Sequence, residues 1–366
     1  MASWAVPRLS EPVGETPLSY NASVPEERPY FYDKTNRRIE PSANPVDHER
    51  AKVRLNEIKT KYWDTLPSEF REKWDMVSLY SPSGSVESAN AVLINPDDGA
   101  YDLTNKINHL TGKQWVKFSC SWFIFNALPS DLAEEKMIDG DSAKHPATYS
   151  PTMISEFIRF FTKEGEVVFD PFMGIGTTLV ACKRTNREGY GIELNPQYFE
   201  IALKRVPRFA SQMYCGSAEE VDRLALPEID FCISSPPYWD VLNRSTKDFR
   251  KNREDKKLDS RYSDSEDDLG NVRDYKEFIN RLSNVYLKTA ARLRKGAYMV
   301  VVVKNVKKEG KLYPLAWDLA GELAHSLVLK DEKIWIQDKV GLAPYGYPHS
   351  WASNILHHYC LVFQKP

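Results

Sequence analysis

The sequence predicts an α/β fold in which helices cover both faces of a mostly parallel, doubly wound sheet. From about Lys144 onward, short apolar runs typical of buried strands alternate with stretches of helical periodicity. A glycine-containing turn at 170–178 stands between one such strand and the next helix, which is where a doubly wound sheet binds its ligand. The last two predicted strands are joined by a loop rich in glycine and proline, which favours an antiparallel hairpin at the sheet edge.

Composition indicates a globular chain and excludes several other classes of protein. Of the 366 residues, 42% are hydrophobic and 27% are charged, close to the average for folded domains. The longest apolar run, 297–303, is far shorter than the roughly 18 residues of a membrane-spanning helix, and no leader-like segment opens the chain. The five cysteines form no Cys-x-x-Cys pair and the histidines no ligand-spaced cluster, so no disulfide scaffold and no metal site are predicted. We therefore expect a cytoplasmic protein without membrane association.

The first 144 residues divide into an arm and a mixed region. Residues 1–45 contain seven prolines and little periodicity, which predicts an extended N-terminal arm. In the region 46–144, apolar residues at helical spacing predict a helix over 47–62, and a second short helix is expected after Ser68. Residues 78–112 are rich in turn-forming residues and are expected to be mostly loop. The region 46–144 is a candidate for target recognition or for a lid.

Residues 145–366 are expected to form the main domain. Predicted strands and predicted helices alternate along this region, and 297–303 is a continuous apolar run typical of a buried strand. The predicted strands are 166–170, 189–193, 229–235, 297–303, 328–338 and 355–364. The predicted helices are 151–162, 177–185, 196–205, 274–294 and 314–326.

A charged segment at 244–274 interrupts this domain. It holds nine basic and nine acidic side chains, with the basic ones concentrated in 244–257 and the acidic ones in 258–274. Such a composition cannot bury a core, so we expect a mobile surface loop.

The turn at 170–178, Asp-Pro-Phe-Met-Gly-Ile-Gly-Thr-Thr, carries the strongest chemical signal. Gly174 and Gly176 let the backbone approach a ligand closely. The next predicted strand ends at Glu193, where a carboxylate can accept hydrogen bonds from ribose hydroxyls. A dehydrogenase turn is disfavoured because Leu179 stands where the third small residue of that motif belongs. These residues indicate a nucleotide-like cofactor at this edge of the sheet.

A second motif, Ser-Ser-Pro-Pro-Tyr-Trp at 234–239, ends another predicted strand. Pro236 and Pro237 lack backbone N–H donors and hold the chain extended, which leaves the carbonyls of Ser235 and Pro236 to accept a hydrogen bond from a ligand. Tyr238 offers a flat face for stacking. A serine, two carbonyls and an aromatic ring would suit an exocyclic amino group on a planar base.

A third motif, His-Pro-Ala-Thr-Tyr at 145–149, stands just before a predicted helix. Together the three motifs resemble those of the DNA amino-methyltransferase family, which methylates the exocyclic N4 of cytosine or N6 of adenine with S-adenosylmethionine. Every fixed position of that family's cofactor loop is present at 170–178, and 235–238 matches its catalytic motif. The resemblance covers about 145–366 and implies a Rossmann-like methyltransferase sheet.

The resemblance also implies roles for the matching positions. Glu193 is expected to hold the cofactor ribose, and Ser217 to lie near its adenine. Cofactor binding as a whole is expected at Thr148, Ser150, Asp170, Pro171, Phe172, Gly174, Gly176, Thr177, Thr178, Glu193, Leu194 and Ser217. The expected catalytic residues, which hold the target base, are Ser235, Pro236, Pro237 and Tyr238.

The resemblance implies direct transfer to an amine without a covalent enzyme intermediate. The target nucleotide leaves the duplex by base flipping, and its amine attacks the sulfonium methyl in line. No Pro-Cys dipeptide occurs, which argues against the C5-cytosine route. Serine at the first catalytic position accompanies N4-cytosine members more often, so Ser235 predicts a site-specific DNA (cytosine-N4-specific) methyltransferase. The alternatives are N6-adenine methylation, RNA amino-methylation and a non-catalytic DNA-binding subunit.

Double-stranded DNA is the expected partner. Because the net charge is −2, phosphate contacts must come from local basic patches. The last predicted strand reaches the end of the chain, so target recognition is expected in 1–144, in the 244–274 loop, or in both. Candidate DNA contacts in the loop are Arg244, Lys247, Arg250, Lys251 and Arg253. The family resemblance also implies a restriction–modification or defence setting with a cognate restriction endonuclease or defence-system subunit, and the oligomeric state stays open.

Overall fold

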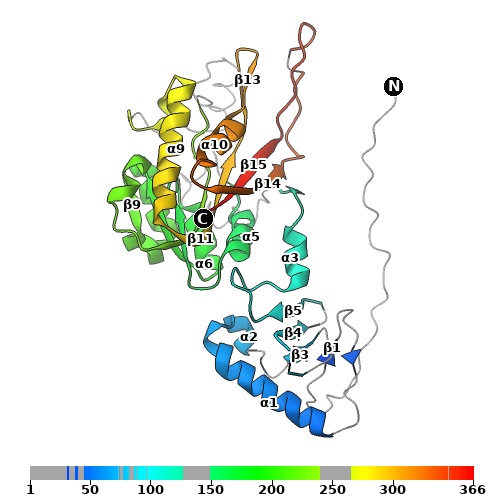
Figure 1. Ribbon diagram of the computed structural model, residues 1–366. Coiled ribbons are helices and arrows are strands. Elements are labelled where there is room, and N and C mark those ends of the chain that lie inside the picture. The colour runs from blue at the N-terminus through cyan, green and yellow to red at the C-terminus, as the bar shows by residue number, and fades with distance from the viewer. Residues whose placement is uncertain are drawn as a thin grey trace.

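The chain, described here as a computed structural model, has a large sheet domain with a smaller N-terminal unit beside it (Figure 1). The structure describes residues 31–32, 38–39, 45–72, 74, 77–81, 86–87, 89–95, 97–126, 149–239, 265–344 and 346–366. The arm expected at 1–45 lies outside the described residues, apart from the short strands β1 (Phe31–Tyr32) and β2 (Arg38–Ile39) and the first residue of α1 (Pro45–Tyr62).

The centre of the large domain is an eight-stranded sheet in the order β6-β14-β15-β11-β10-β7-β8-β9. The pairs β8–β9, β7–β8, β7–β10 and β10–β11 are all parallel. These strands are β7 (Val167–Asp170), β8 (Glu188–Glu193), β9 (Met213–Cys215), β10 (Ile229–Ser234) and β11 (Leu293–Val303). The predicted α/β class and the mostly parallel sheet are therefore confirmed.

The antiparallel hairpin is also present, but it does not form the sheet edge. Strand β15 (His357–Gln364) lies between β11 and β14 (Val328–Ile336) and is antiparallel to both. A further strand, β6 (Trp122–Ile124), pairs in parallel with β14 on its outer side. The sheet thus takes one strand from the region 46–144. A three-residue strand is too short to show the alternation that would reveal it in the sequence.

Helices cover both faces of this sheet, because successive strand residues point to opposite sides. Val168 packs with helices α5, α6 and α7 in one core cluster, whereas its neighbour Phe169 packs with α9 and α10 in the other. The helices start where the sequence supplies caps: Ser150 accepts hydrogen bonds at the start of α5, and Asp274 does so at the start of α9. Their bounds are α5 (Pro151–Phe161), α6 (Thr177–Arg184), α7 (Pro196–Arg205), α9 (Tyr275–Arg292) and α10 (Leu315–Leu323).

The N-terminal unit has a core of its own. Helix α1 and the short helix α2 (Ser68–Glu72) occur where they are predicted, and Ala51 and Ile58 of α1 are buried. They pack against a five-stranded sheet in the order β2-β1-β3-β4-β5.

The described residues of 78–112 are mostly loop, as predicted, but the segment also contains three short strands. The segment contains β3 (Ser78–Tyr80), β4 (Ala91–Asn95), β5 (Gly99–Asp102) and the first residue of helix α3 (Gly112–Phe118). Leu79, Val92 and Tyr101 of the three strands are buried together in the core of the N-terminal unit. Burial of these side chains stabilises the three strands. The polar residues that connect the strands dominate the composition of the segment.

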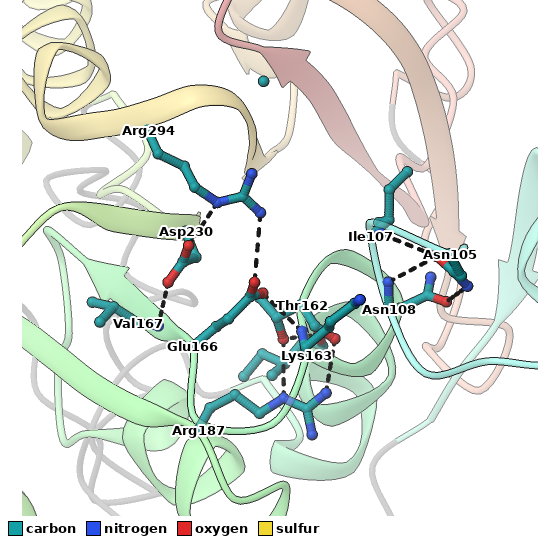
Figure 2. Close-up of polar contacts among 12 residues, drawn as sticks. Asn105, Ile107, Asn108, Thr162, Lys163, Glu166, Val167, Arg187, Asp230 and Arg294 are labelled. Atoms are coloured by element: carbon teal, nitrogen blue, oxygen red, sulfur yellow. Dashed lines mark hydrogen bonds and ion pairs between the residues drawn. The ribbon is translucent and has the colours of Figure 1, made fainter. Parts of the chain in front are cut away.

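Hydrogen bonds and stacked rings fix the N-terminal unit to the large domain. The Asn108 side chain donates a hydrogen bond to the Phe160 carbonyl at the end of α5, at 2.5 Å. The Ser68 hydroxyl donates to Glu164 at 3.2 Å, and the ring of Phe118 stacks on that of Phe160 at 4.1 Å. Figure 2 shows the loop of Asn105 and Asn108 beside the segment that carries Thr162 and Lys163.

A polar network closes the amino ends of the parallel strands (Figure 2). Arg294 on β11 donates a hydrogen bond to Asp230 on β10 at 2.6 Å, and the other carboxylate oxygen of Asp230 accepts from the backbone N–H of Val167 at 2.8 Å. Glu166 lies 3.7 Å from the Arg294 guanidinium. This network fixes the sheet edge opposite to the one at which a ligand would bind.

Part of the predicted charged loop is folded into the core. Residues 240–264 lie outside the described residues, but 265–274 contain the short 3-10 helix η6 (Leu269–Asn271). Leu269 is 3% exposed and Val272 is 7% exposed, and both belong to the core cluster of α9 and α10. The prediction of a surface loop over the whole of 244–274 is therefore wrong for its last ten residues, because two apolar side chains within the acidic run are buried.

Candidate active site

A cavity of about 920 Å³, including its open mouth, lies at the carboxyl ends of β7, β8 and β10. Parallel strands bring their carboxyl ends to one edge, so residues far apart in the chain meet there. The predicted site residues that line this cavity are Pro171, Phe172, Gly174, Thr177, Glu193, Leu194, Ser217, Ser235, Pro236, Pro237 and Tyr238. The two motifs of the sequence thus share one cavity, while the role of each residue stays a prediction.

The turn between β7 and α6 forms one wall of the cavity. Gly174 has φ +56° and Gly176 has φ +82°, a left-handed conformation that side chains with a Cβ rarely adopt. A Cβ on Gly176 would also lie 3.1 Å from the Cβ of Ala202 on α7. Gly176 therefore shapes the turn but is not among the residues that line the cavity.

Asp170 lies behind this wall, contrary to the expectation of direct cofactor contact. Its side chain is fully buried and accepts hydrogen bonds from the Phe172 backbone N–H at 3.0 Å and from the hydroxyls of Tyr149 and Thr178. Burial raises the pKa of Asp170 to about 6. Asp170 and Thr178 thus hold the turn in shape, and Tyr149, which lines the cavity, connects them to it.

Ser150, another predicted cofactor residue, is not among the residues that line the cavity. Ser150 is buried and caps α5, where its hydroxyl accepts hydrogen bonds from the backbone of Thr152 and Met153. Thr148 lies outside the described residues, as do all the predicted DNA contacts: Arg244, Lys247, Arg250, Lys251 and Arg253.

Glu193 ends β8 and lines the same cavity as the catalytic motif. One carboxylate oxygen accepts from the Gly174 backbone N–H at 2.8 Å, and the other from the Asn195 backbone N–H at 2.7 Å. Burial, together with the nearby carboxylates of Asp170 and Asp268, raises the pKa of Glu193 to about 7. Each oxygen keeps a lone pair with which to accept a hydrogen bond from a ligand hydroxyl.

The charged residues lining the cavity within the described chain are all acidic. Besides Glu193 they are Glu219, Asp267 and Asp268. Glu219 is paired with the Arg281 guanidinium, with one N–H···O distance of 3.0 Å, so its charge is balanced. A cavity with carboxylates and no lysine or arginine on its described walls suits a cationic ligand, such as a sulfonium, and repels a phosphate.

Asp267, Asp268 and Leu269 are site residues that the sequence did not predict. They lie in the last part of the charged segment 244–274 and line the same cavity as the β7–α6 turn. The signal in the sequence is the apolar pair Leu269 and Val272 within an acidic run, which indicates a buried turn rather than a solvated one.

The catalytic motif follows β10 directly. The hydroxyl of Tyr238 lies 3.3 Å from the Ser235 Oγ, and burial raises the pKa of Tyr238 above its ordinary value. The ring of His358 on β15 lies 6.1 Å from the Tyr238 ring and stacks on Trp335 at 4.4 Å. His358 therefore packs beside the Tyr238 ring, where burial lowers the pKa of the imidazole to about 3 and keeps it neutral.

Metal ligands and membrane spans are both absent from the described part of the chain. There, no three His, Cys, Asp or Glu side chains group closely enough to hold a metal ion. Nor does any helix of those residues have the length and apolarity to cross a bilayer.

The sheet topology and the acidic cavity at its carboxyl edge are consistent with the S-adenosylmethionine-dependent methyltransferase class that the motifs resemble. Comparison with protein families is more specific: a family model described as DNA methylase (N6_N4_Mtase) matches residues 16–204, and the chain belongs to this family. The matched stretch includes the β7–α6 turn and Glu193. The resemblance inferred from the motifs is thereby confirmed, and S-adenosylmethionine is the cofactor, as predicted.

Curated relatives match over shorter stretches. The type II methyltransferase M.Cfr9I of Citrobacter freundii is 45% identical over 62 residues, which are 17% of this chain and 21% of that protein. The orphan methyltransferase M.BamHII of Bacillus amyloliquefaciens is 33% identical over 76 residues, 21% of this chain and 29% of that protein. The chain thus spans less than a third of the length of these relatives.

Solved structures give distant likenesses. TrmN from Thermus thermophilus has 14% identity and a TM-score of 0.42, over 66% of this chain and 55% of that one. A methyltransferase from Pyrococcus furiosus has 18% identity and a TM-score of 0.38, over 64% of this chain and 94% of that one. Both scores are low, and the fold assignment depends on the sheet topology.

Proposed function

We propose that the chain is a DNA methyltransferase that transfers a methyl group from S-adenosylmethionine to the exocyclic N4 of a flipped cytosine. The observation that carries this proposal is that Ser235–Tyr238 and the cofactor turn line one cavity. A cofactor held by Glu193 and the turn would lie within reach of an amine held by the catalytic motif.

Residues of this chain match the parts of the cofactor. The Glu193 carboxylate would accept hydrogen bonds from the ribose hydroxyls, while Ile192, Leu194 and Leu269 offer apolar surface for the adenine. Ser217, which lines the cavity beside them, offers a hydroxyl to the adenine edge. When bound, S-adenosylmethionine supplies an electrophilic methyl group on a positively charged sulfur, and the acidic walls favour that charge.

The catalytic motif would orient the target amine. The Ser235 Oγ and the Pro236 carbonyl accept hydrogen bonds from the two N–H groups of the amine, which directs the nitrogen lone pair toward the methyl group. The Tyr238 ring stacks on the extruded base and replaces the stacking that is lost in the duplex. Its position is fixed by the 3.3 Å contact with Ser235 and by packing against His358.

Ser235 favours cytosine over adenine as the target. In the family the serine goes more often with N4-cytosine, and an aspartate at this position with N6-adenine. Both side chains accept a hydrogen bond from an amine, so hydrogen-bond chemistry permits either base. N6-adenine methylation is therefore the second candidate.

The experiment combines the full chain with methyl-labelled S-adenosylmethionine and unmethylated mixed-sequence DNA, followed by digestion to nucleosides. Label in N4-methylcytosine supports the proposal, and label in N6-methyladenine overturns the choice of base. Transfer to RNA but not DNA would change the substrate class. Cofactor binding without transfer to either would indicate a non-catalytic subunit.

Two further assignments belong to this proposal. The basic residues at 244–253 would contact DNA phosphates beside the site, and a cognate endonuclease or defence-system subunit would act on the same DNA. The first is a prediction from the basic composition of the loop, to be tested by DNA binding of charge-neutralised variants. The second is a prediction from the family resemblance, to be tested by co-purification.

A further inference from the structure

Two segments stand beyond the carboxyl edge of the sheet, on the side of the cavity. One is the hairpin of β12 (Val306–Lys308) and β13 (Lys311–Tyr313), and the other is the long connection between β14 and β15, which the structure describes over 337–344 and 346–356. Figure 1 shows both at the same end of the large domain, far from the N-terminal unit. They are called here the β12–β13 hairpin and the 337–356 arm.

The 337–356 arm exposes an unusual amount of apolar surface. Trp351 is 89% exposed, Tyr347 is 81% exposed and Leu342 is 72% exposed. Large aromatic side chains are normally covered, and several of them exposed together on one projecting segment mark an interaction site.

Specific hydrogen bonds hold the arm in shape. The Asn354 side chain accepts from the Ala343 backbone N–H at 3.0 Å and donates to its carbonyl at 2.9 Å, which ties the two sides of the arm together. The His349 backbone N–H donates to the Gly346 carbonyl at 2.8 Å and closes a turn beside the exposed rings. Both rings are therefore presented by a segment that is hydrogen-bonded to itself.

The two segments contact each other through a lysine. The Lys307 ammonium donates to the Ser353 carbonyl at 2.6 Å and to the Ser353 hydroxyl at 2.9 Å, and it lies 5.9 Å from the ring of Trp351. The hairpin and the arm thus form one surface in which a cation flanks the exposed indole.

This surface is basic, although the chain as a whole is slightly acidic. It carries Lys307, Lys308, Lys311 and Lys339 against Glu309 and Asp338, and Asp338 already accepts a hydrogen bond from Asn126 at 2.6 Å. A lysine beside an exposed indole, with further lysines on the same two segments, is the chemistry of a surface that binds nucleic acid, with cations for phosphates and a ring for bases.

The surface is continuous with the catalytic motif. Trp239, the residue after Tyr238, packs against Tyr313 of the hairpin with the ring centres 4.5 Å apart. The Lys308 ammonium lies 4.7 Å from the Trp239 ring. A polymer bound on the hairpin and the arm would therefore pass beside the position assigned to the extruded base.

We propose that the β12–β13 hairpin and the 337–356 arm form the surface that engages duplex DNA, with Trp351 stacking on or wedging between bases. In this arrangement the lysines contact phosphates on either side. Base extrusion removes one base from the stack of the duplex. An aromatic side chain that stacks on the neighbouring bases stabilises the DNA in this state. This inference rests on the proposed function and assigns DNA contact to a region outside those predicted from the sequence.

The test measures duplex binding and methyl transfer separately with the full chain. Binding of labelled mixed-sequence duplex DNA is measured with S-adenosylhomocysteine present over a salt series, and labelled methyl transfer is measured on the same DNA. The variants are Trp351→Ala and the triple variant Lys307→Ala, Lys311→Ala and Lys339→Ala. The matched controls are Leu329→Ala, at a 44% exposed apolar position, and Lys330→Ala, both at the far end of β14.

We expect Trp351→Ala to weaken duplex binding at least tenfold and to lower transfer through a higher KM for DNA, with the affinity for S-adenosylhomocysteine unchanged. The triple lysine variant should lower the slope of log affinity against log salt by about 2 to 3, roughly 0.9 for each phosphate that is no longer neutralised. The two controls should behave like the wild type.

Two results would overturn the inference. One is wild-type DNA affinity in both test variants. The other is a monomer–dimer equilibrium that shifts with Trp351→Ala while DNA binding does not, which would make the surface a self-interface. Absence of methyl transfer by the wild type, together with duplex binding that depends on Trp351, would instead refute the proposed function and leave this surface as a DNA-binding one.

Discussion

The Glu193 carboxylate accepts a hydrogen bond from the backbone N–H of Gly174 across 2.8 Å. This bond joins the end of β8 to the β7–α6 turn, so residues 19 positions apart form one wall of the cavity. A glycine at 174 permits the left-handed turn that aims its N–H at the carboxylate. The carboxylate that would hold the ribose is thereby fixed before any ligand arrives.

Cofactor affinity should increase as the pH rises through 7. The pKa of Glu193 is raised to about 7, so at pH 6 most of the free protein carries a neutral side chain that accepts hydroxyl hydrogen bonds weakly. Glu193→Gln should weaken S-adenosylmethionine binding by about tenfold or more at pH 8 and remove the Glu193 share of the pH dependence. Calorimetric titration between about pH 6 and 8.5 measures both effects. Glu200→Gln, at an exposed position on α7, is the control, and equal affinities for wild type and Glu193→Gln at pH 8 would contradict the assignment.

Ser235→Ala should lower kcat for DNA methylation by roughly a hundredfold, because one acceptor for the target amine is lost. The affinity for S-adenosylmethionine should change little, since the serine is assigned to the base. Ser235→Asp restores an acceptor and should recover part of the activity. Single-turnover transfer kinetics separate these effects, and an unchanged kcat in Ser235→Ala would exclude the serine from the chemistry.

Asp170 should make the fold less stable as the pH rises from 4 to 6. In the unfolded chain its carboxyl ionises near the ordinary value of 3.8, whereas in the native protein burial raises the pKa to about 6. The contribution of Asp170 to the free energy of unfolding is therefore fully present below pH 3.8. It is lost as the pH rises through 6, which lowers the free energy of unfolding by about 3 kcal/mol. Glu193 acts in the same direction at slightly higher pH.

Asp170→Asn isolates this effect because the amide does not ionise. Urea unfolding at about pH 4.5, 6 and 7.5 should show a weaker decline in the free energy of unfolding for Asp170→Asn than for the wild type. Parallel declines in the two proteins would show that the buried carboxyl does not titrate in this range.

Leu269→Ala should destabilise the protein by about 2–4 kcal/mol and weaken cofactor binding together. The side chain is 3% exposed, belongs to the core cluster of α9 and α10, and lines the cavity. Thermal unfolding with and without S-adenosylmethionine gives both quantities. Leu342→Ala, at a 72% exposed position, should leave the melting temperature unchanged, and an equal loss in the two variants would argue against the packed position of Leu269.

Asn108→Ala should lower the free energy of unfolding by about 1–3 kcal/mol, because buried partners would lose their hydrogen bonds. The fully buried Asn108 side chain donates to the Phe160 carbonyl and accepts from the Leu110 backbone N–H at 3.0 Å. Chemical denaturation compares it with Lys106→Ala, an exposed change in the same loop. Stability equal to that of the control would mean that this junction does not hold the two parts together.

The periodic parts of the fold could be predicted from the sequence. The strand predicted at 297–303 is a continuous apolar run because it is buried on both faces, and it forms the second part of β11. The strand predicted at 229–235 matches β10 closely. The helices that follow Ser150 and Asn195 begin where capping residues and prolines stand together. The short strands β3 to β6 could not be found in this way, because three to five residues carry too little pattern.

The sequence by itself determined the fold class, the two motifs and the sheet edge at which they meet. Turn chemistry and apolar periodicity are local properties, and the carboxyl ends of parallel strands always share an edge. Only the tertiary structure decided that Asp170 lies behind the cavity wall, that Asp268 and Leu269 complete the wall, and that Trp351 is exposed on the arm beside the catalytic motif. These facts depend on contacts between distant segments, and the burial or exposure of a side chain is decided by what the rest of the chain places over it.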